Sequence, residues 1–482
     1  MPTIPCCPNL FQNAQDLHQF LLTCKQTIAD QKGRQIISIS LEVDPMDPLA
    51  ILHSLHPVEQ PHFYIESKHK KTNFIHRDFD GSILAIGITA AAEIEGVNRF
   101  HRAKSFIDNC LSEVITSGNS ELPFAGPHFF CSFSFFNEKT DQMATHVPAT
   151  IFLPRWQISC SQGICVLVAN LIITLDLNLK TLIDQVQTEF QLITSTRYQV
   201  PEIYSHHRKT VDWPDSIHTH NFKAAVLSAL QAISDQHLEK IVLAHAIDIT
   251  ASKPFNLIHS LHNLRQLYPD CYVFSINHGK GPTFIGASPE RLVSVFNQEL
   301  VADALAGSAP RGKTRLEDST FMSDLLVNRK ERHEHQLVIQ FITQCLQHLG
   351  CQLRRSQVPH LLQLSNIQHL RTLIRAHVPP GVHLLEIVSQ LHPTPAVAGL
   401  PREMTCTYIR QLETFDRGLY AGPLGWLDHR GNGEFIVGIR SALVQDRQAR
   451  LYAGAGIVQG SDPDRELSEI HLKLQAILNA LV

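Results

Sequence analysis

The chain reads Leu451-Tyr-Ala-Gly-Ala-Gly-Ile-Val-Gln-Gly-Ser-Asp-Pro-Asp-Arg-Glu-Leu-Ser-Glu-Ile-His-Leu-Lys473 near its C-terminus. This pattern predicts a strand, a glycine-rich turn and then a helix that Pro463 can begin. On the helix Glu466, Glu469 and Lys473 lie at i, i+3 and i+7, so they share one face. Two carboxylates one turn apart repel each other, which suggests a cation between them or an anionic substrate held there. Spacing alone favours a solvated face in which Glu469 pairs with Lys473.

Outward from this stretch, strand patterns come in runs with helix patterns between them. Helices are expected at Asn9–Ala29, Leu179–Phe190, Asn221–Gln236, Phe255–Tyr268, Phe321–Leu349, Gly381–Leu391 and Arg402–Thr414. Strands are expected at Phe129–Phe136, Ala149–Leu153, Cys165–Leu175, Ile241–Ile249, Cys271–Asn277, Thr283–Gly286, Arg291–Phe296, Leu300–Ala306, Val358–Leu364, Gln368–Ala376, Gly422–Leu427 and Glu434–Val444. This order is typical of a mixed α/β fold with largely antiparallel sheets. The polar segment Val200–His220 is a candidate break between two parts of the chain.

Composition narrows the classes of function. The 482 residues are 44% hydrophobic and 18% charged, and the formal net charge of −4 gives no electrostatic reason to bind nucleic acid or an anionic membrane. No run of about 18 apolar residues is present, and the N-terminus lacks the pattern of a signal peptide. The eleven cysteines include no C-x-x-C pair, so free thiols in a reducing, cytoplasmic setting are expected.

Glu334 breaks the pattern of its helix. It lies on the same stripe as Val338, Phe341 and Cys345, where an unpaired carboxylate is costly to bury. Glu334 therefore either binds a metal or substrate or marks the place where the stripe reaches the surface.

Three charged residues lie at or within apolar strands. Lys240 begins a strand and shares a face with small, apolar residues, so desolvation could make it a general base. Glu290 begins another strand, and Arg440 lies inside an apolar one, where a substrate carboxylate is a good partner. The alternatives are ordinary polar strand ends for Lys240 and Glu290 and a structural ion pair for Arg440.

Together these segments resemble the chorismate-utilising enzymes. The resemblance covers residues 220–482 and depends on seven motifs in order, the last being the Gly-Ala-Gly turn quoted above. The others are Lys240-Ile-Val-Leu-Ala, Phe284-Ile-Gly-Ala-Ser-Pro-Glu-Arg-Leu-Val293, Ala304-Leu-Ala-Gly-Ser-Ala-Pro-Arg-Gly312, Lys330-Glu-Arg-His-Glu-His-Gln336, Leu391-His-Pro-Thr-Pro-Ala-Val-Ala-Gly-Leu-Pro401 and Asp416-Arg-Gly-Leu-Tyr-Ala-Gly-Pro-Leu-Gly-Trp426.

The resemblance implies one large domain over residues 1–482 rather than two domains separated near residue 210. Residues 1–210 would be its divergent N-terminal part, and residues 220–482 its motif-bearing catalytic part. The family fold consists of two similar halves, with largely antiparallel sheets packed face to face and helices outside.

The resemblance also implies a site. Lys240 matches the base that activates water, and Glu290 matches the acid that protonates the departing hydroxyl. Glu334 and Glu466 match Mg²⁺ ligands, with Glu469 close by. The positions that match substrate-binding groups are Gly307, Ser308, Ala396, Tyr420, Arg440, Gly454, Gly456 and Lys473. Water would attack C2 of chorismate as the C4 hydroxyl leaves, which requires neutral Lys240 and protonated Glu290 near pH 7.

Within the family the chain is most similar to isochorismate synthases of the menaquinone or phylloquinone type. Ala306 stands where relatives that make 4-amino-4-deoxychorismate carry a lysine, and Lys240 is unlike the base position of anthranilate synthases. No glutaminase subunit is therefore expected, and a monomer or weak homodimer is predicted. The alternatives are a salicylate synthase, which would also expel pyruvate, and a non-catalytic subunit with the same fold.

Overall fold

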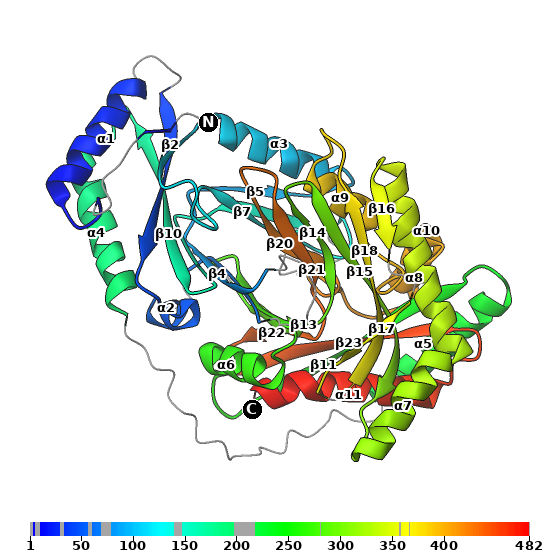
Figure 1. The fold of residues 1–482 in the computed structure, drawn as a ribbon. Helices are drawn as coiled ribbons and strands as arrows, with labels where there is room; N and C mark the ends of the chain where they lie inside the picture. The colour runs from blue at the N-terminus through cyan, green and yellow to red at the C-terminus, as the bar shows by residue number, and fades with distance from the viewer. Residues whose placement is uncertain are drawn as a thin grey trace.

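Two large β-sheets form the body of the protein in a computed structural model (Figure 1). The structure describes residues 3–4, 10–28, 33–55, 60–68, 79–138, 147–196, 217–279, 281–355, 358–365 and 367–481. Most of the candidate break Val200–His220 lies outside these ranges; only its last residues, from Ile217 on, are described, and they are helical.

The first sheet has 13 strands and combines the N-terminal and C-terminal parts of the chain. In spatial order its strands are β1 (Thr3–Ile4), β6 (Val114–Gly118), β2 (Arg34–Val43), β10 (Ile164–Thr174), β9 (Trp156–Ser161), β4 (Gly81–Ile86), β3 (His62–Ser67), β12 (Tyr272–Asn277), β13 (Thr283–Ser288), β22 (Ser441–Gln445), β23 (Gln448–Val458), β11 (Lys240–Thr250) and β19 (Gly399–Leu400). The junction between the two parts is the antiparallel pair β3–β12.

The second sheet has 10 strands and combines the same two parts. Its order is β16 (Gln352–Arg355), β18 (Ile367–His377), β15 (Glu299–Pro310), β14 (Arg291–Phe296), β21 (Gly433–Val437), β20 (Pro423–Asp428), β7 (His128–Phe133), β8 (Ala149–Leu153) and β5 (Ala90–Ile94), with β17 (His360–Gln363) paired to β18. Rings from the two sheets meet in the core, where the centroids of Phe63 on β3 and Phe130 on β7 are 5.3 Å apart.

The prediction of a mixed α/β fold with largely antiparallel sheets is confirmed. Among the described strand pairs only β1–β6 and β2–β6 are parallel. Long strands such as β10 are buried along nearly their whole length, because Ile, Val and Leu on both faces contact the core.

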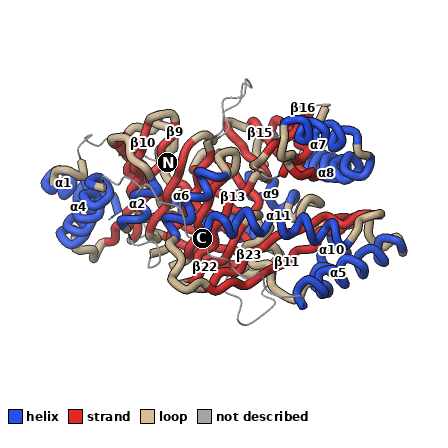
Figure 2. Tube along the Cα trace, turned by 90° about the horizontal axis from the view of Figure 1, so that it is seen from below, coloured by secondary structure: helices blue, strands red, loops and turns tan. Residues whose placement is uncertain are grey.

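Helices cover the outer surfaces of the sheets. They are α1 (Ala14–Ile28), α2 (Pro48–Ser54), α3 (Arg99–Ser112), α4 (Leu179–Ser195), α5 (Ile217–Ser234), α6 (Leu257–Leu267), α7 (Arg315–Val327), α8 (Arg329–His348), α9 (Leu384–Leu391), α10 (Arg402–Leu412) and α11 (Pro463–Leu481). The pair α1 and α4 lies at one end of the molecule, and α7 and α8 lie at the other (Figure 2). The final helix, α11, packs against β23, α5 and α6.

The expectation of one helix over Phe321–Leu349 is wrong. Two helices, α7 and α8, meet at Asn328, whose backbone is not helical and whose side chain accepts hydrogen bonds from the amides of Lys330 and Glu331. Asparagine is a strong N-cap residue, and this capping fixes where α8 begins. In the first turn of α8, Lys330 then contacts Glu466 on α11 and Glu331 contacts Ser308 on β15.

The expectation of free thiols is wrong for Cys160 and Cys165. These two residues form a disulfide across the β9–β10 hairpin, where they are directly paired with their Cα atoms 4.2 Å apart. A separation of five residues hid the pair in the sequence, because the hairpin register alone brings the two side chains together. No helix in the described part of the chain is long and apolar enough to span a membrane.

Candidate functional site

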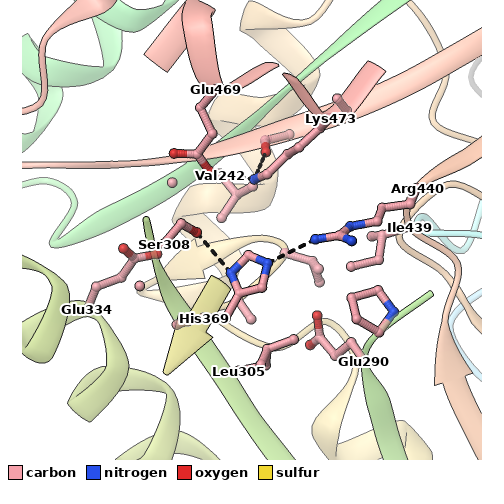
Figure 3. A pocket seen from close by; sticks show the side chains of 18 of the residues that line it. Val242, Glu290, Leu305, Ser308, Glu334, His369, Ile439, Arg440, Glu469 and Lys473 are labelled. Carbon is pink, nitrogen blue, oxygen red and sulfur yellow. Dashed lines mark hydrogen bonds and ion pairs between the residues drawn. The ribbon is translucent and has the colours of Figure 1, made fainter. Parts of the chain in front are cut away.

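One cavity gathers the predicted site residues. It lies between the first turn of α8, the end of β15, the strands β11 and β23, and α11 (Figure 3). Every predicted site residue except Lys240 lines it: Glu290, Gly307, Ser308, Glu334, Ala396, Tyr420, Arg440, Gly454, Gly456, Glu466, Glu469 and Lys473. Segments that are distant in sequence therefore converge on one place, as the motif order predicts.

Lys240 lies directly beneath the lining of this cavity. Its side chain is fully buried, and its Nζ lies 2.7 Å from Oε1 of Glu334. The pair packs directly against the backbone of β23 at Gly456. A Cβ at this glycine would lie only 2.7 Å from Glu334 Oε1 and 3.3 Å from Lys240 Cε, so a side chain here would push the ion pair apart.

Three lysine–glutamate ion pairs lie in or against this cavity. Besides Lys240 and Glu334, they are Lys330–Glu466, with 3.1 Å between Nζ and Oε1, and Lys473–Glu469, with 2.6 Å. The last pair is the one that the solvated-face alternative predicts. However, its two side chains are only 18% and 27% exposed and face the cavity, so the face is not a solvated one.

A fourth carboxylate, Glu331, belongs to the same group. It accepts a hydrogen bond of 2.8 Å from the amide of Ser308, and burial together with the charge of Glu334 raises its pKa to about 7. Glu331 and Glu334 on α8 thus repeat the i, i+3 spacing of Glu466 and Glu469 on α11. Glu331 is not among the site residues predicted from the sequence, although this repeated spacing could have indicated it.

The four carboxylates are a donor set that suits Mg²⁺ chemically, because this ion takes carboxylate and water oxygens. Their present positions are not those of a formed metal site. Among the described residues no three His, Cys, Asp or Glu side chains are arranged to hold a metal ion, and lysine ammonium groups balance the charges instead. The donor set therefore fits the ion only if the ion pairs separate.

The ion pairs also limit the free space. The cavity amounts to about 100 Å³, whereas pockets for small molecules typically measure ~300–1,000 Å³. The side chains of Lys330 and Lys473 line this space. Lys473 also donates a hydrogen bond of 2.7 Å to the carbonyl of Gly454 on β23.

Glu290 is held at the floor of the cavity where β13 turns into β14. Its amide donates to the hydroxyl of Ser288, and that hydroxyl in turn donates to the carbonyl of Val437. Burial, followed by the charge of Asp303, raises the pKa of Glu290 to about 8, even though nearby lysines oppose the shift. The carboxyl group is therefore protonated at pH 7, which is the state that a general acid needs.

A chain of hydrogen bonds positions Arg440. Its Nη2 lies 3.0 Å from Nε2 of His369, whose Nδ1 lies 3.0 Å from the hydroxyl of Ser308 (Figure 3). Because arginine can only donate, Nε2 accepts and Nδ1 carries the proton. Burial and the charges of Arg440 and Lys473 lower the pKa of His369 well below its usual value, so the ring is neutral.

Arg440 keeps a donor available for a ligand. Its side chain is buried, yet Nη1 has no hydrogen-bond partner among the described residues. A buried, unsatisfied guanidinium nitrogen beside a cavity is well suited to a carboxylate. The residue that holds Arg440 in place, His369, was also missed by the sequence analysis, since one histidine in an apolar strand gives no distinguishing pattern.

Two glycines of β23 keep the cavity open. A Cβ at Gly454 would lie 2.7 Å from the hydroxyl oxygen of Tyr420, and the corresponding atom at Gly456 would meet Glu334. Tyr420 itself stacks on Tyr452, with ring centroids 5.2 Å apart. Both rings line the cavity, so the glycines allow an aromatic wall to approach the backbone closely.

Known proteins match the chain along most of its length. A family described as "Chorismate binding enzyme" matches residues 19–482. The salicylate biosynthesis isochorismate synthase of Pseudomonas aeruginosa is 41% identical over 263 residues, which is 54% of this chain and 54% of that protein. Isochorismate synthase DhbC of Bacillus subtilis is 36% identical over 285 residues, which is 58% of this chain and 70% of DhbC. The chain thus spans about half the length of the first of these relatives.

Solved structures are similar to this chain over a larger share of its length than the sequence relatives are. The menaquinone-specific isochorismate synthase MenF of Escherichia coli matches with a TM-score of 0.73 and 26% identity, covering 96% of this chain and all of MenF. A 2,3-dihydroxybenzoate-specific isochorismate synthase from Bacillus anthracis matches with a TM-score of 0.68 and 27% identity, over 89% and 99% of the two chains.

Proposed function

The chain belongs to the chorismate binding enzyme family, and from this premise we propose that it is an isochorismate synthase, an isomerase that converts chorismate to isochorismate. The names of its relatives support this reaction. The observation that carries it is the buried Glu290 in the same cavity as an unsatisfied arginine donor, where burial raises the pKa of the carboxyl group to about 8.

Residues of the chain supply each element of the proposed reaction. Arg440 and Lys473 bind the carboxylates of the substrate. Glu290 donates its proton to the C4 hydroxyl, which leaves as water, while a second water forms a bond to C2. Lys240 accepts the proton of the attacking water, and the ring double bonds shift, so the product is an isomer of the substrate. Lys240 then releases its proton to the solvent and Glu290 takes one up, so both residues return to their starting states.

Lys240 must be free of Glu334 to perform this role. At 2.7 Å the carboxylate of Glu334 is the ion-pair partner of Lys240 Nζ. Lys240 can act as a base only after Glu334 has moved to another partner. The three ion pairs thus describe a resting arrangement, and catalysis requires it to rearrange.

We propose that Glu334 and Glu466, with Glu469 and Glu331 nearby, hold Mg²⁺ in the working enzyme. When bound, the ion would neutralise a substrate carboxylate and the carboxylates of the protein. Lys330, Lys240 and Lys473 would then leave these carboxylates, which frees Lys240 to accept a proton and Lys473 to bind the substrate. We also propose that the product enters quinone biosynthesis in the cytoplasm, which the match to MenF over its full length supports.

One incubation tests the reaction. The purified protein is mixed with chorismate and Mg²⁺, and the products are separated by chromatography while pyruvate is measured with lactate dehydrogenase. Isochorismate without pyruvate is expected. Salicylate and pyruvate as main products would show a salicylate synthase, and complete recovery of chorismate would favour the non-catalytic subunit.

A further inference from the structure

A second cavity, of about 630 Å³, lies where the N-terminal part of the chain meets the C-terminal part. Its walls are the start of α3, the residues that follow β7, the end of α9 and one face of α10. Figure 1 labels these elements. Its size falls within the usual ~300–1,000 Å³ of pockets for small molecules. No residue of this cavity lines the first one.

The second cavity is cationic. Arg99, Arg402 and Arg410 line it, and no aspartate or glutamate does so among the described residues. Arg99 is buried and fixed by hydrogen bonds to Ser134 and to backbone carbonyls. Arg402 is half-buried and donates to the carbonyl of Gln390, whereas Arg410 is exposed and makes no ion pair within the described part of the chain. Positive charge without a protein counter-ion favours an anionic ligand.

Aromatic rings form the other walls of the second cavity. Phe100, Phe135 and Phe136 line it, and the guanidinium of Arg410 lies over the ring of Phe136 at 4.3 Å from the centroid. Stacking on a ring leaves the edge of a guanidinium free for a bidentate carboxylate contact. Flat apolar walls beside such cations suit a ligand that combines a ring with a carboxylate.

The buried side chain of Arg417 connects the two cavities. The guanidinium of Arg417 lies 4.2 Å from the ring centroid of Phe135 in the second cavity and 5.9 Å from that of Tyr420 in the first. It also donates hydrogen bonds of 2.8 Å to the carbonyls of Val397 and Val242, and both of these residues line the first cavity.

The chain itself provides a second connection. His392 and Pro393 line the second cavity, and Ala396 and Val397, only a few residues later, line the first. A ligand that moves Phe135 or this short segment therefore displaces atoms of the proposed active site.

We propose that the second cavity is a regulatory site that binds a small cyclic or aromatic carboxylate and changes turnover through Phe135, Arg417 and the segment His392–Val397. The first part of this proposal, that the cavity binds such a ligand, depends only on the geometry of the second cavity. The second part, that the bound ligand changes turnover, rests on the proposed function, because it is measured as turnover of chorismate.

The first part is tested with 4-fluorobenzoate, titrated into the full-length protein and followed by fluorine NMR. Saturable binding is expected, with 4-fluorobenzyl alcohol and acetate binding at least tenfold more weakly because each lacks one of the two features. Arg410→Gln should weaken binding of 4-fluorobenzoate about tenfold, equivalent to about 1.4 kcal/mol. The matched control is Arg315→Gln, which removes the same charge from an exposed position at the start of α7 and should bind as the wild type does.

A second variant covers the case in which the ligand binds in the cavity without contacting Arg410. Thr407 is exposed on α10 and lines the cavity, so Thr407→Trp should fill it without changing the charge and should abolish binding. If both Arg410→Gln and Thr407→Trp bind 4-fluorobenzoate as tightly as the wild type, the site is elsewhere and the proposal is overturned.

The second part is tested by initial rates with chorismate at saturating 4-fluorobenzoate. A change of at least about threefold in kcat or KM is expected for the wild type and for Arg315→Gln, and none for Thr407→Trp. Unchanged rates in a protein that binds the probe would refute the coupling. If no variant turns chorismate over even without the probe, the proposed function fails while the binding result still stands.

Discussion

Replacing Glu290 by glutamine should raise stability and abolish most activity, and the stability gain should depend on pH. The pKa of Glu290 is raised from 4.5 to about 8, chiefly by burial and then by Asp303, against the opposing charges of Lys240 and Lys473. Because the folded protein holds this proton more tightly than the unfolded chain, its free energy of unfolding falls as pH rises from 4.5 to about 8.

The size of this change in unfolding free energy follows from the interval between the two pKa values of Glu290, 4.5 and about 8. Each pH unit within it corresponds to about 1.36 kcal/mol, so the wild type loses about 4 kcal/mol from this group between pH 5 and pH 8. Glutamine has nearly the same shape and does not titrate. The difference in unfolding free energy between Glu290→Gln and the wild type should therefore shift by about 4 kcal/mol in favour of the variant over the same range.

Urea denaturation of both proteins at pH 5, 6.5 and 8, followed by tryptophan fluorescence, measures this difference. All other titrating groups are shared by the two proteins and cancel. The matched control is Glu299→Gln on β15, where the glutamate side chain is exposed instead of buried. A stability difference that is the same at all three pH values would refute the assignment of Glu290 as a buried, protonated acid.

The kinetic side of the prediction uses the same variant. The wild-type kcat/KM should fall as pH rises through about 8, because Glu290 loses the proton that it donates. Loss of a general acid typically reduces the rate by ~10²–10⁴-fold, and Glu290→Gln should show a reduction in this range. A variant that is as active as the wild type would exclude Glu290 as the proton donor.

Three further predictions concern the same cavity. Chelation of divalent ions should abolish turnover of chorismate, and added Mg²⁺ should restore it; undiminished activity in excess EDTA would exclude the metal. Gly454→Ala places a Cβ 2.7 Å from the Tyr420 hydroxyl and should lower kcat/KM at least about tenfold, with the circular dichroism spectrum unchanged. His369→Phe removes the acceptor that positions Arg440, so the KM for chorismate should rise about tenfold or more while kcat changes less; a pure loss of kcat would argue against a positioning role.

Much of the fold could be predicted because its signals are local. Helix α11 carries buried Leu467, Ile470 and Leu474 at helical spacing, and the strands near it alternate or run apolar. The break at Asn328 could not be located in this way, because residues 328–336 are all polar and hydrophobic spacing gives no signal there. Only the capping geometry of the asparagine side chain separates the two helices.

The sequence predicts which candidate residues gather at the cavity, but not how they pair with one another. The structure brings Glu334 and Glu466 to one cavity, as the motifs indicate. It also pairs Lys330 with Glu466 across 136 positions of sequence, and that contact depends on how two helices face each other. The sequence contains the lysines and carboxylates but not their partners. For the same reason the neutral Lys240 that the mechanism needs was expected, whereas the structure shows it paired with Glu334.

The pairing of β3 with β12 has a consequence for truncated versions of this protein. All seven motifs lie in residues 220–482, which makes that segment an inviting fragment to express on its own. Cutting there would remove β3 from the edge of β12 and β7 from the edge of β20, leaving two apolar strand edges open. Such edges recruit other chains. The fragment should therefore precipitate or form inclusion bodies, and co-expression with residues 1–210 as a separate polypeptide should rescue it.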